Sequence, residues 1–502
     1  MTKRNYKEGQ NRHLALLFPP SLDEYVAEGN PVRAIDAYVE TLDLAALGFR
    51  NSEPGLTAGQ PAFHPGLLVR LYLYGYLNGI RSSRKLEREA VRNVEAIWLA
   101  GNLRPGYKTI ADFRKHNGKA LRAANRDFIL LCRHLGLLGG EEVAVDGSFF
   151  KGDAGKDGIY TADRLERQLA ELDRKIGDYQ ARMDAQDAAD DGAGLGSLSE
   201  DAGLAEKIRL LKQRQAEKKA LQDRLEQSAD TQVSTVDPDA RLLSQRGQSV
   251  AGYNAQIAVD GKHKLVVAAE VTQDGNDTRQ LVPMLDQAQD ILQSGHLVGL
   301  GDAGYYSGEQ IKLAGERGYA VYVPVPKKDG AVIEEGRFTR ERFAYDAADD
   351  CYRCPQGERL DKGGQPVEKR GRRVWVYQSR REGCDACPLR QQCLSEKAGT
   401  KKVTRWEHED VVDRHRAHMR SGAAAGRMRR RASLAEHPFG TLKHRAGMHH
   451  FLMRGLEKCR GEFSLMVLCY NLTRVLNLLG IDRFREGCAR WVGNGAGTPA
   501  IA

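Results

Sequence analysis

Residues 252–271 read GYNAQIAVDGKHKLVVAAEV, and this stretch decides the fold. Its two apolar runs flank Asp260-Gly261, a dipeptide that strongly favours the tight turn of a β-hairpin. Another strand is predicted at residues 142–146, because valines alternate there with Ala144 and Asp146. An antiparallel hairpin therefore follows a strand that ends on an acidic residue.

Helices and strands are expected to alternate after the hairpin. Asp277 or Thr278 caps a predicted helix that runs to Leu292. The remaining elements are a strand from Leu297 that ends at Asp302, a helix from Ser307 and a strand at residues 320–323. The order β, β-β, α, β, α, β is the layout of an RNase H-like α/β domain, interrupted here after its first strand.

The chain of 502 residues exceeds the roughly 100–200 residues of a typical domain, so at least two cores with insertions are expected. Its net charge of +9 points toward a polyanionic partner. The position of the charges is more informative than their sum. Within residues 427–460 the acidic residues are Glu436 and Glu457, and the cations are Arg427, Arg429, Arg430, Arg431, Lys443, Arg445, Arg454, Lys458 and Arg460.

The chain lacks the run of roughly 20 apolar residues that a membrane span requires. Residues 1–20 also lack the apolar core of a signal peptide. A cytoplasmic protein is therefore expected. Its nine cysteines are then expected to be reduced or to bind metal rather than to form disulfides.

The first part of the chain is predicted to be helical. Residues 65–77 are apolar on several faces, which is typical of a buried helix. A second helix is expected at 84–99, and a third begins near Thr109. Helices joined by short turns that carry arginine and serine are compatible with DNA binding, and a plain helical bundle is the alternative.

Two insertions interrupt the predicted α/β domain, and the first carries a heptad seam. Apolar residues spaced by 4, 3, 4, 3 and 4 positions predict an antiparallel helical hairpin. A spacer or an oligomerisation arm is favoured over a chemical role for this hairpin. The seam consists of Leu165, Leu169, Leu172, Ile176, Tyr179 and Met183.

The second insertion carries two CxxC pairs, which can close a tetrahedral thiolate site. The first pair is Cys351 and Cys354, and the second, Cys384 and Cys387, is followed by Cys393. A structural zinc site is predicted from Cys351, Cys354, Cys384 and either Cys387 or Cys393. Unliganded thiols are the alternative, because five cysteines compete for four places. The single cysteines are expected in the core, and these are Cys132, Cys459, Cys469 and Cys488.

Asp146 and Asp302 each lie at the end of an apolar strand. The first and fourth strands of an RNase H-like sheet are adjacent, which brings the two carboxylates together. Because two close carboxylates are costly without a cation, a divalent metal ion is one explanation of this pair, and two unrelated turn caps are the other. Glu436, two residues before Pro438, offers a third carboxylate at a helix end or bend, and a surface ion pair is the alternative. Lys443 follows Glu436 by seven residues, so on a helix both face the same side.

Three stretches of sequence resemble the DDE transposases of bacterial insertion sequences. They are VAVDGSFF at 143–150, LGDAGYYS at 300–307 and AEHPFGTLKH at 435–444. The segment FHPGLLVRLYLYGYLNGIRSSRKLE at 63–87 resembles the helical region that these proteins carry ahead of the catalytic domain. The resemblance covers most of the chain and implies that Asp146, Asp302 and Glu436 are the metal-binding triad, with Lys443 as the lysine that follows the glutamate.

One position departs from the family signature. Many relatives carry an arginine four residues before the glutamate, where this chain has Ala432, with Arg431 one residue earlier. The tyrosine of the signature has no counterpart at its expected spacing. Phosphate contacts are expected from Lys443, Arg431 and Arg445, and contacts with the ends of the element from Arg81, Arg84 and Arg114.

The resemblance implies a transposase that binds the ends of its element and performs metal-dependent DNA cleavage and strand transfer. Mg²⁺ is the expected cofactor, and Mn²⁺ can substitute for it. The expected partner is double-stranded DNA at the inverted repeats and the target site, bound by a homodimer in association with the nucleoid. A domesticated DNA-binding protein, or a nuclease of the same fold without transposition, is the alternative.

The predicted organisation has two domains. A helical DNA-binding domain covers residues 1–138, and an RNase H-like catalytic domain covers 139–330 and 407–482. The other predicted segments are the helical hairpin at 161–228, the Cys-rich insertion at 331–406 and a C-terminal tail at 483–502.

Overall fold

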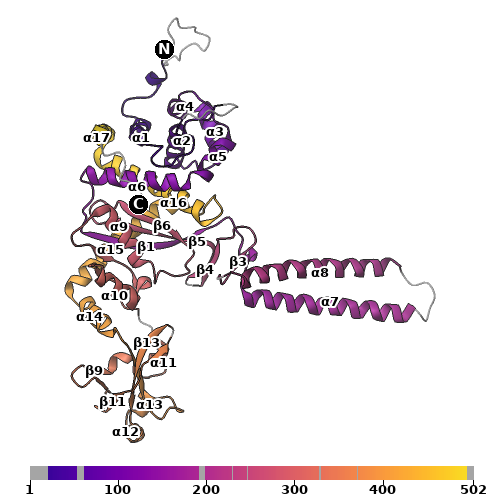
Figure 1. Ribbon diagram of the computed structural model, residues 1–502, viewed down its shortest axis with the longest axis vertical. Coiled ribbons are helices and arrows are strands. Elements are labelled where there is room, and N and C mark those ends of the chain that lie inside the picture. The colour runs from indigo at the N-terminus through magenta and orange to yellow at the C-terminus, as the bar shows by residue number, and fades with distance from the viewer. Residues whose placement is uncertain are drawn as a thin grey trace, which may run out of the picture.

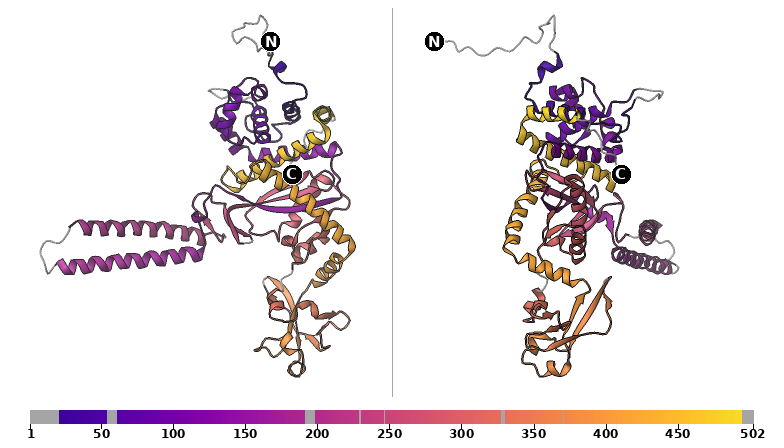
Figure 2. Two further views of the ribbon diagram at one scale, coloured as in Figure 1. Left: turned by 180° about the vertical axis from the view of Figure 1, so that it is seen from behind. Right: turned by 60° about the vertical axis from the view of Figure 1, so that its left-hand side comes forward.

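The structure of the protein is a computed structural model that describes residues 21–53, 61–190, 198–228, 230–245, 247–326, 330–369 and 371–493. A group of helices lies on one side of a central sheet, and a second, smaller sheet lies on the opposite side (Figure 1). A helical arm extends sideways from the central sheet. Figure 2 shows from two further sides that the arm and the second sheet point in different directions.

The central sheet has six strands in the order β4-β5-β1-β7-β8, and β6 also pairs with β5. β5 is antiparallel to β1, β4 and β6, whereas β7 and β8 run parallel to β1. The predicted hairpin is confirmed as β5 and β6. The strands are β1 (Glu142–Lys151), β4 (Arg241–Gln245), β5 (Gln248–Asp260), β6 (Val266–Thr272), β7 (Val298–Leu300) and β8 (Ala320–Tyr322).

Helices cover both faces of the sheet. Val143 and Val145 belong to the same buried cluster as side chains of α9 (Leu281–Leu292) and α10 (Gly308–Glu316). Ala144 packs instead with Leu434 and Ala435 of α15 (Gly422–Gly440). Since successive side chains of a strand point to opposite faces, Asp146 shares the α15 face with Ala144.

The helices ahead of β1 share one core with the sheet. The connecting element is α16 (Leu456–Leu479), which contacts α2 and α6 on one side and β6 on the other. One continuous cluster of buried side chains extends from Val26 to Trp491, so the chain is not divided into two cores near residue 138. The helices of this module are α1 (Pro31–Glu40), α2 (Pro65–Leu77), α3 (Ser83–Arg92), α4 (Val94–Leu99), α5 (Tyr107–His116) and α6 (Gly118–His134).

A buried ion cluster fixes α16 to these helices. The carboxylate of Glu462 is fully buried, and it lies 2.9 Å from Nη2 of Arg81 and 3.7 Å from Nη1 of Arg114. Its Oε2 accepts hydrogen bonds from the backbone N–H groups of Leu452 and Met453. The prediction that Arg81 and Arg114 contact DNA is therefore corrected, because both guanidinium groups lie inside the protein and neutralise Glu462.

Part of the predicted C-terminal tail is a helix. α17 (Ile481–Gly493) packs against α1. Its buried residues Phe484, Cys488 and Trp491 are spaced by four and three positions, which places them on one face. Within the described residues no single helix is long and apolar enough to cross a membrane, and α16 and α17 meet that measure only as a pair bent by 112°.

The first insertion forms the arm. α7 (Ala162–Asp190) and α8 (Leu198–Glu226) pack along each other, and the short strands β2 (Ile159–Tyr160) and β3 (Val233–Ser234) join at their base. On α7 the side chains of the predicted seam are the less exposed ones, with Leu165, Leu169 and Ile176 buried. This confirms the helical hairpin. The Gly-rich stretch 191–197 lies outside the described residues.

The second insertion contains an antiparallel sheet that the sequence did not predict. Its strand order is β12-β13-β11-β10-β9, with β14 also paired to β13. Phe343, Tyr352, Leu360, Tyr377 and Val403 form its small core. The elements are α11 (Gly330–Glu334), β9 (Ala344–Asp346), β10 (Cys351–Arg353), β11 (Arg359–Lys362), β12 (Val367–Lys369), β13 (Arg372–Ser379), α12 (Arg381–Asp385), α13 (Arg390–Cys393), β14 (Lys402–Trp406) and then α14 (Glu409–Met419).

Replacement of Arg81 by methionine is expected to destabilise the helical module by about 3 kcal/mol, because it leaves part of the charge of Glu462 buried and uncompensated. The change should appear as a lower midpoint of thermal unfolding. Arg84→Met is the matched control, since Arg84 is exposed and close in sequence. Equal midpoints for the two variants would contradict the proposed importance of the buried cluster.

Candidate active site

Asp146 and Asp302 come together because β1 and β7 pair in parallel. Ala144 lies opposite Leu300 in this pairing, and each aspartate follows two residues later. The two carboxylates converge on the guanidinium group of Arg431, whose Nη2 is 2.7 Å from Oδ1 of Asp146 and 3.8 Å from Oδ2 of Asp302. Two of the three predicted metal-binding carboxylates thus surround one positive charge.

The environment of Asp146 favours a nearby cation. Burial raises the pKa of its carboxyl to about 6, Arg431 opposes this shift, and the charges of Asp302 and Asp277 add to it. Carboxylate oxygens are the ligands that hard divalent cations prefer. The donor set and the position of the Arg431 guanidinium therefore fit a divalent cation between Asp146 and Asp302.

Glu436 lies in the last turn of α15, close to Pro438 within the same helix, as the sequence predicts. Its side chain is exposed. No hydrogen bond or ion pair joins it to Asp146 or Asp302 in the described part of the chain, and these three carboxylates do not form a tight ligand set there. A π-helical turn, Thr441–Arg445, follows directly, and such irregularities are frequent at functional sites.

Lys443 reaches the same strand as Asp146. Its Nζ donates to Oγ of Ser148 at 2.6 Å and to the backbone oxygen of Phe149 at 2.7 Å. Burial lowers the pKa of Lys443 to about 8, and the charge of Asp146 opposes that shift. The π-helical turn therefore places the predicted lysine beside β1.

Asp277 is a fourth acidic residue at this site, and the sequence pattern indicated only a helix cap. α9 begins at Leu281, so the carboxylate of Asp277 is not used as its cap. Instead its Oδ1 accepts hydrogen bonds from Nδ2 of Asn254 at 2.8 Å and from Nε2 of Gln256 at 2.6 Å. Burial raises the pKa of Asp277, and these two hydrogen bonds oppose that shift. The signal that could have revealed it is the pair of amides at alternate positions of an otherwise apolar strand.

Two glycines leave space for the carboxylate of Asp277. A Cβ atom on Gly147 would lie 2.8 Å from Oδ1 of Asp277. A Cβ atom on Gly304 would lie 2.9 Å from Oδ1 of Asp302 and 3.6 Å from Oδ2 of Asp277. Asp277 therefore lies close to both backbone segments that carry the predicted metal-binding aspartates.

Two of the predicted DNA-contacting arginines lie at the surface. Arg84 is exposed, and its guanidinium carbon lies 5.1 Å from the centre of the Tyr107 ring. Arg445, at the end of the π-helical turn, is also exposed. Their contacts with DNA stay predictions.

Four of the five cysteines in the second insertion line one cavity of about 70 Å³, namely Cys354, Cys384, Cys387 and Cys393. Cys351 is fully buried on β10 and lies apart from them. Its sulfur and the carboxylates of Asp346 and Asp349 form the group of potential ligand atoms that lie within 4.8 Å of one another in the described residues. Cys387 and Cys393 both line the cavity with Cys354 and Cys384, and Cys351 does not, whereas no three of these sulfurs form a group within 4.8 Å in the described residues. The four single cysteines are buried and free, as predicted, at Cys132, Cys459, Cys469 and Cys488.

The Asp346 and Asp349 carboxylates already have cationic partners. Each lies 3.2 Å from Nη2 of Arg353. Asp349 also lies 3.3 Å from Nη1 of Arg359. This group therefore forms a surface ion-pair network around β10.

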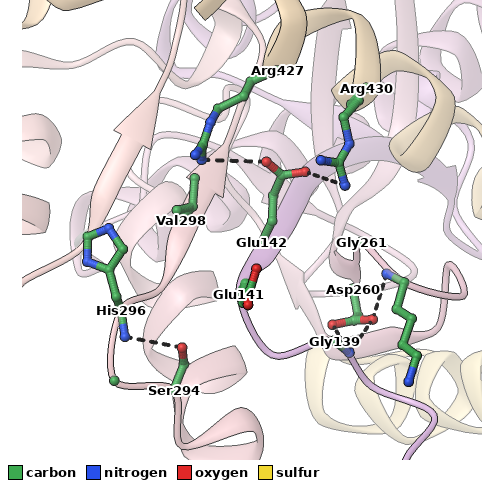
Figure 3. A pocket seen from close by; sticks show the side chains of 12 residues that line it. Gly139, Glu141, Glu142, Asp260, Gly261, Ser294, His296, Val298, Arg427 and Arg430 are labelled. Carbon is green, nitrogen blue, oxygen red and sulfur yellow. Dashed lines mark hydrogen bonds and ion pairs between the residues drawn. The ribbon is translucent and has the colours of Figure 1, made fainter. Parts of the chain in front are cut away.

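A hollow of about 700 Å³ lies at the start of β1, four residues before Asp146 (Figure 3). Glu142 in this hollow is paired with Arg427 at 3.6 Å and with Arg430 at 3.1 Å. Asp260 accepts backbone hydrogen bonds from the loop at 139–140. Both carboxylates have partners within the protein, so the hollow is distinct from the site at Asp146.

Comparison with protein families gives two matches. Residues 20–116 match the family described as Transposase domain (DUF772), and residues 353–476 match the Transposase DDE domain. The second match includes Glu436 and Lys443. No curated protein and no solved structure matches the chain.

The two matched regions are in contact through α16 and α2, and both are described as transposase domains. More particularly, the two matches together support a DDE transposase of an insertion sequence.

Replacement of Gly147 by alanine is expected to lower stability by about 1–3 kcal/mol, because the new methyl group needs space that Asp277 and Gln256 occupy. The midpoint of thermal unfolding provides the measurement. Gly155→Ala serves as the control, since no heavy atom lies within 4 Å of a Cβ built there. If both variants melt with the parent protein, the packing around Gly147 is looser than described.

Proposed function

We propose that this transposase cuts and joins DNA phosphodiesters at a divalent-cation site formed by Asp146, Asp302 and Glu436. The observation that carries the proposal is the convergence of Asp146 and Asp302 on one positive charge, that of Arg431. Two carboxylates that adjacent strands bring together are expensive to hold close unless a cation uses them.

The strand order supports an RNase H-like catalytic domain. β6, β5 and β1 form an antiparallel set, and β7 and β8 extend it in parallel with β1. The strands that carry the two aspartates are neighbours in this order. Glu436 enters from α15, which packs against β1.

Mg²⁺ is the proposed cofactor, with Mn²⁺ as a substitute, because the three residues offer only oxygen ligands. Ions held by these carboxylates would supply activation of the attacking hydroxyl or water and stabilisation of the leaving oxygen during displacement at phosphorus. The protein itself positions the DNA strand. Arg431 and Lys443 flank Asp146 and carry the charge needed to hold phosphates, and Arg445 extends this basic surface outward.

The proposed substrate is double-stranded DNA at the ends of the element and at the target. Arg84, exposed on the helical module, is a proposed contact with the ends. We propose a homodimer on DNA, because two ends have to be held together for strand transfer, and action in the cytoplasm at the nucleoid.

Asp302→Asn is expected to abolish metal-dependent cleavage of DNA that carries the flanking sequences of the gene, because it removes a metal-binding charge and keeps the side-chain shape. Cleavage is measured on gels with Mg²⁺ or Mn²⁺. Asp410→Asn is the control, since Asp410 is an exposed helix residue paired with Arg414.

Equal cleavage by the parent and by Asp302→Asn would place the active site elsewhere. If neither protein cuts and both bind the DNA, the chain is a DNA-binding protein that has lost transposition.

We also propose a structural zinc site made by Cys354, Cys384, Cys387 and Cys393. The four thiols are free and line one small cavity beside the core of the second sheet. Tight turns shape both CxxC segments, since the N–H of Gly357 donates to the oxygen of Cys354 and the N–H of Arg390 donates to that of Cys387. Four thiolates are a complete ligand set for a structural zinc ion.

Protein purified under reducing conditions is expected to contain about one equivalent of zinc. Cys387→Ala should lose it, whereas Cys351→Ala should keep it, because Cys351 lies outside the cavity. Elemental analysis of the purified proteins makes the comparison. Absence of zinc from the parent protein, or its loss from both variants, would contradict this ligand set.

A further inference from the structure

We propose that Asp277 is a positioning residue of the catalytic site, which holds the turn carrying Asp302 and adds a fourth negative charge beside the proposed cation. This inference rests on the function proposed above. It assigns a role to a residue that lies outside both regions matched by transposase families.

The position of Asp277 is fixed by two buried amides. Asn254 and Gln256 are both fully buried on β5. Their side chains lie on one face of the strand, opposite Phe149 and Gly147 of β1. Both amides donate to Oδ1 of Asp277, and Gln256 also donates to Oδ1 of Asn254 at 3.0 Å. Because buried amide donors need acceptors, this pair specifies where the carboxylate lies.

The same network reaches the turn that carries Asp302. The hydroxyl group of Tyr305 donates to Oε1 of Gln256, and the Tyr305 side chain is almost completely buried. The backbone N–H of Tyr305 donates to the backbone oxygen of Asp302 at 3.1 Å. A continuous path of hydrogen bonds thus connects Asp277 with the backbone of the catalytic turn.

The second oxygen of Asp277 faces the catalytic site. Oδ2 receives no hydrogen bond from the described residues, and it lies 3.6 Å from the place where a Cβ atom on Gly304 would stand. The carboxylate of Asp302 is beside the same place, because its Oδ1 accepts the N–H of Gly304 at 2.8 Å. The carboxylates of Asp277 and Asp302 therefore both lie close to Gly304.

The anchoring of the loop does not depend on a charge at residue 277. The oxygen of Asp274 accepts a hydrogen bond from Asn254, and its carboxylate accepts one from Gln280. Gln273 donates to the backbone oxygen of Asp239 at 2.6 Å. These contacts fasten the loop on either side of Asp277. The loop therefore does not need the negative charge of Asp277. The position of this carboxylate near those of Asp146 and Asp302 is better explained by the binding of a cation.

Asp277→Asn separates the two roles. An asparagine keeps one carbonyl oxygen, which can still accept the hydrogen bonds from Asn254 and Gln256, and it replaces the oxygen that faces Asp302. The fold is therefore expected to be retained, while the negative charge is lost. Asp274→Asn is the matched control, because it removes the same charge from an exposed position in the same loop.

The experiment measures Mn²⁺ affinity of the full-length protein without DNA, by titration calorimetry, together with the midpoint of thermal unfolding. Asp277→Asn is expected to weaken Mn²⁺ binding by about tenfold or more, since residues that support metal ligands commonly contribute at that level. Asp274→Asn should bind as the parent does. All three proteins should melt at similar temperatures.

Unchanged Mn²⁺ affinity in Asp277→Asn would overturn the inference, and so would a loss of affinity that the Asp274→Asn control shares. If the parent binds Mn²⁺ and Asp302→Asn does not, the proposed cation site stands whatever Asp277 does. If the parent binds no Mn²⁺, the proposed function fails first and the role of Asp277 fails with it.

Discussion

The parallel pairing of β1 with β7 determines where the charged groups of this protein meet. It brings together Asp146, in the middle of β1, and Asp302, just after the end of β7, and their mutual repulsion has to be compensated. Other features of the site follow from this requirement. Arg431 comes from α15 on one face, Asp277 lies near Gly147 from the other face, and the sheet between them is buried by apolar side chains. The strand order therefore places charged carboxylates next to a sheet that apolar side chains bury.

Local patterns allowed much of the fold to be predicted. The hairpin around Asp260-Gly261 and the heptad seam from Leu165 depend on residues close in sequence, and both are present. The connection between the two strands is longer than the predicted tight turn and covers residues 261–265. The roles of Arg81 and Arg114 could not be predicted, because their partner Glu462 lies 381 and 348 positions away in sequence. The strands of the second insertion were missed since they are short and carry many polar residues. Asp277 was missed because an aspartate ahead of a helix is usually a cap.

For the candidate site too, some residues could be predicted from the sequence and others could not. Asp146 and Asp302 were identifiable because each follows an apolar run, and their proximity follows from the strand order. The prediction that the first strand ends at Asp146 was wrong, because β1 continues to Lys151. The choice among five cysteines needed the three-dimensional structure, since spacing alone does not show which way Cys351 points from β10. Glu436 precedes the π-helical turn Thr441–Arg445 and Lys443 lies within it, and the path of this turn brings the lysine to β1. The seven-residue spacing places Glu436 and Lys443 on the same side only of a regular helix, and the π-helical turn interrupts that regularity.

The helical arm leaves the sheet between β1 and β4, so its base is continuous with the strand that carries Asp146. Each helix of the arm has 29 residues, which corresponds to a length of about 40 Å. The arm therefore carries its far end about 40 Å away from the short strands β2 and β3 at its base.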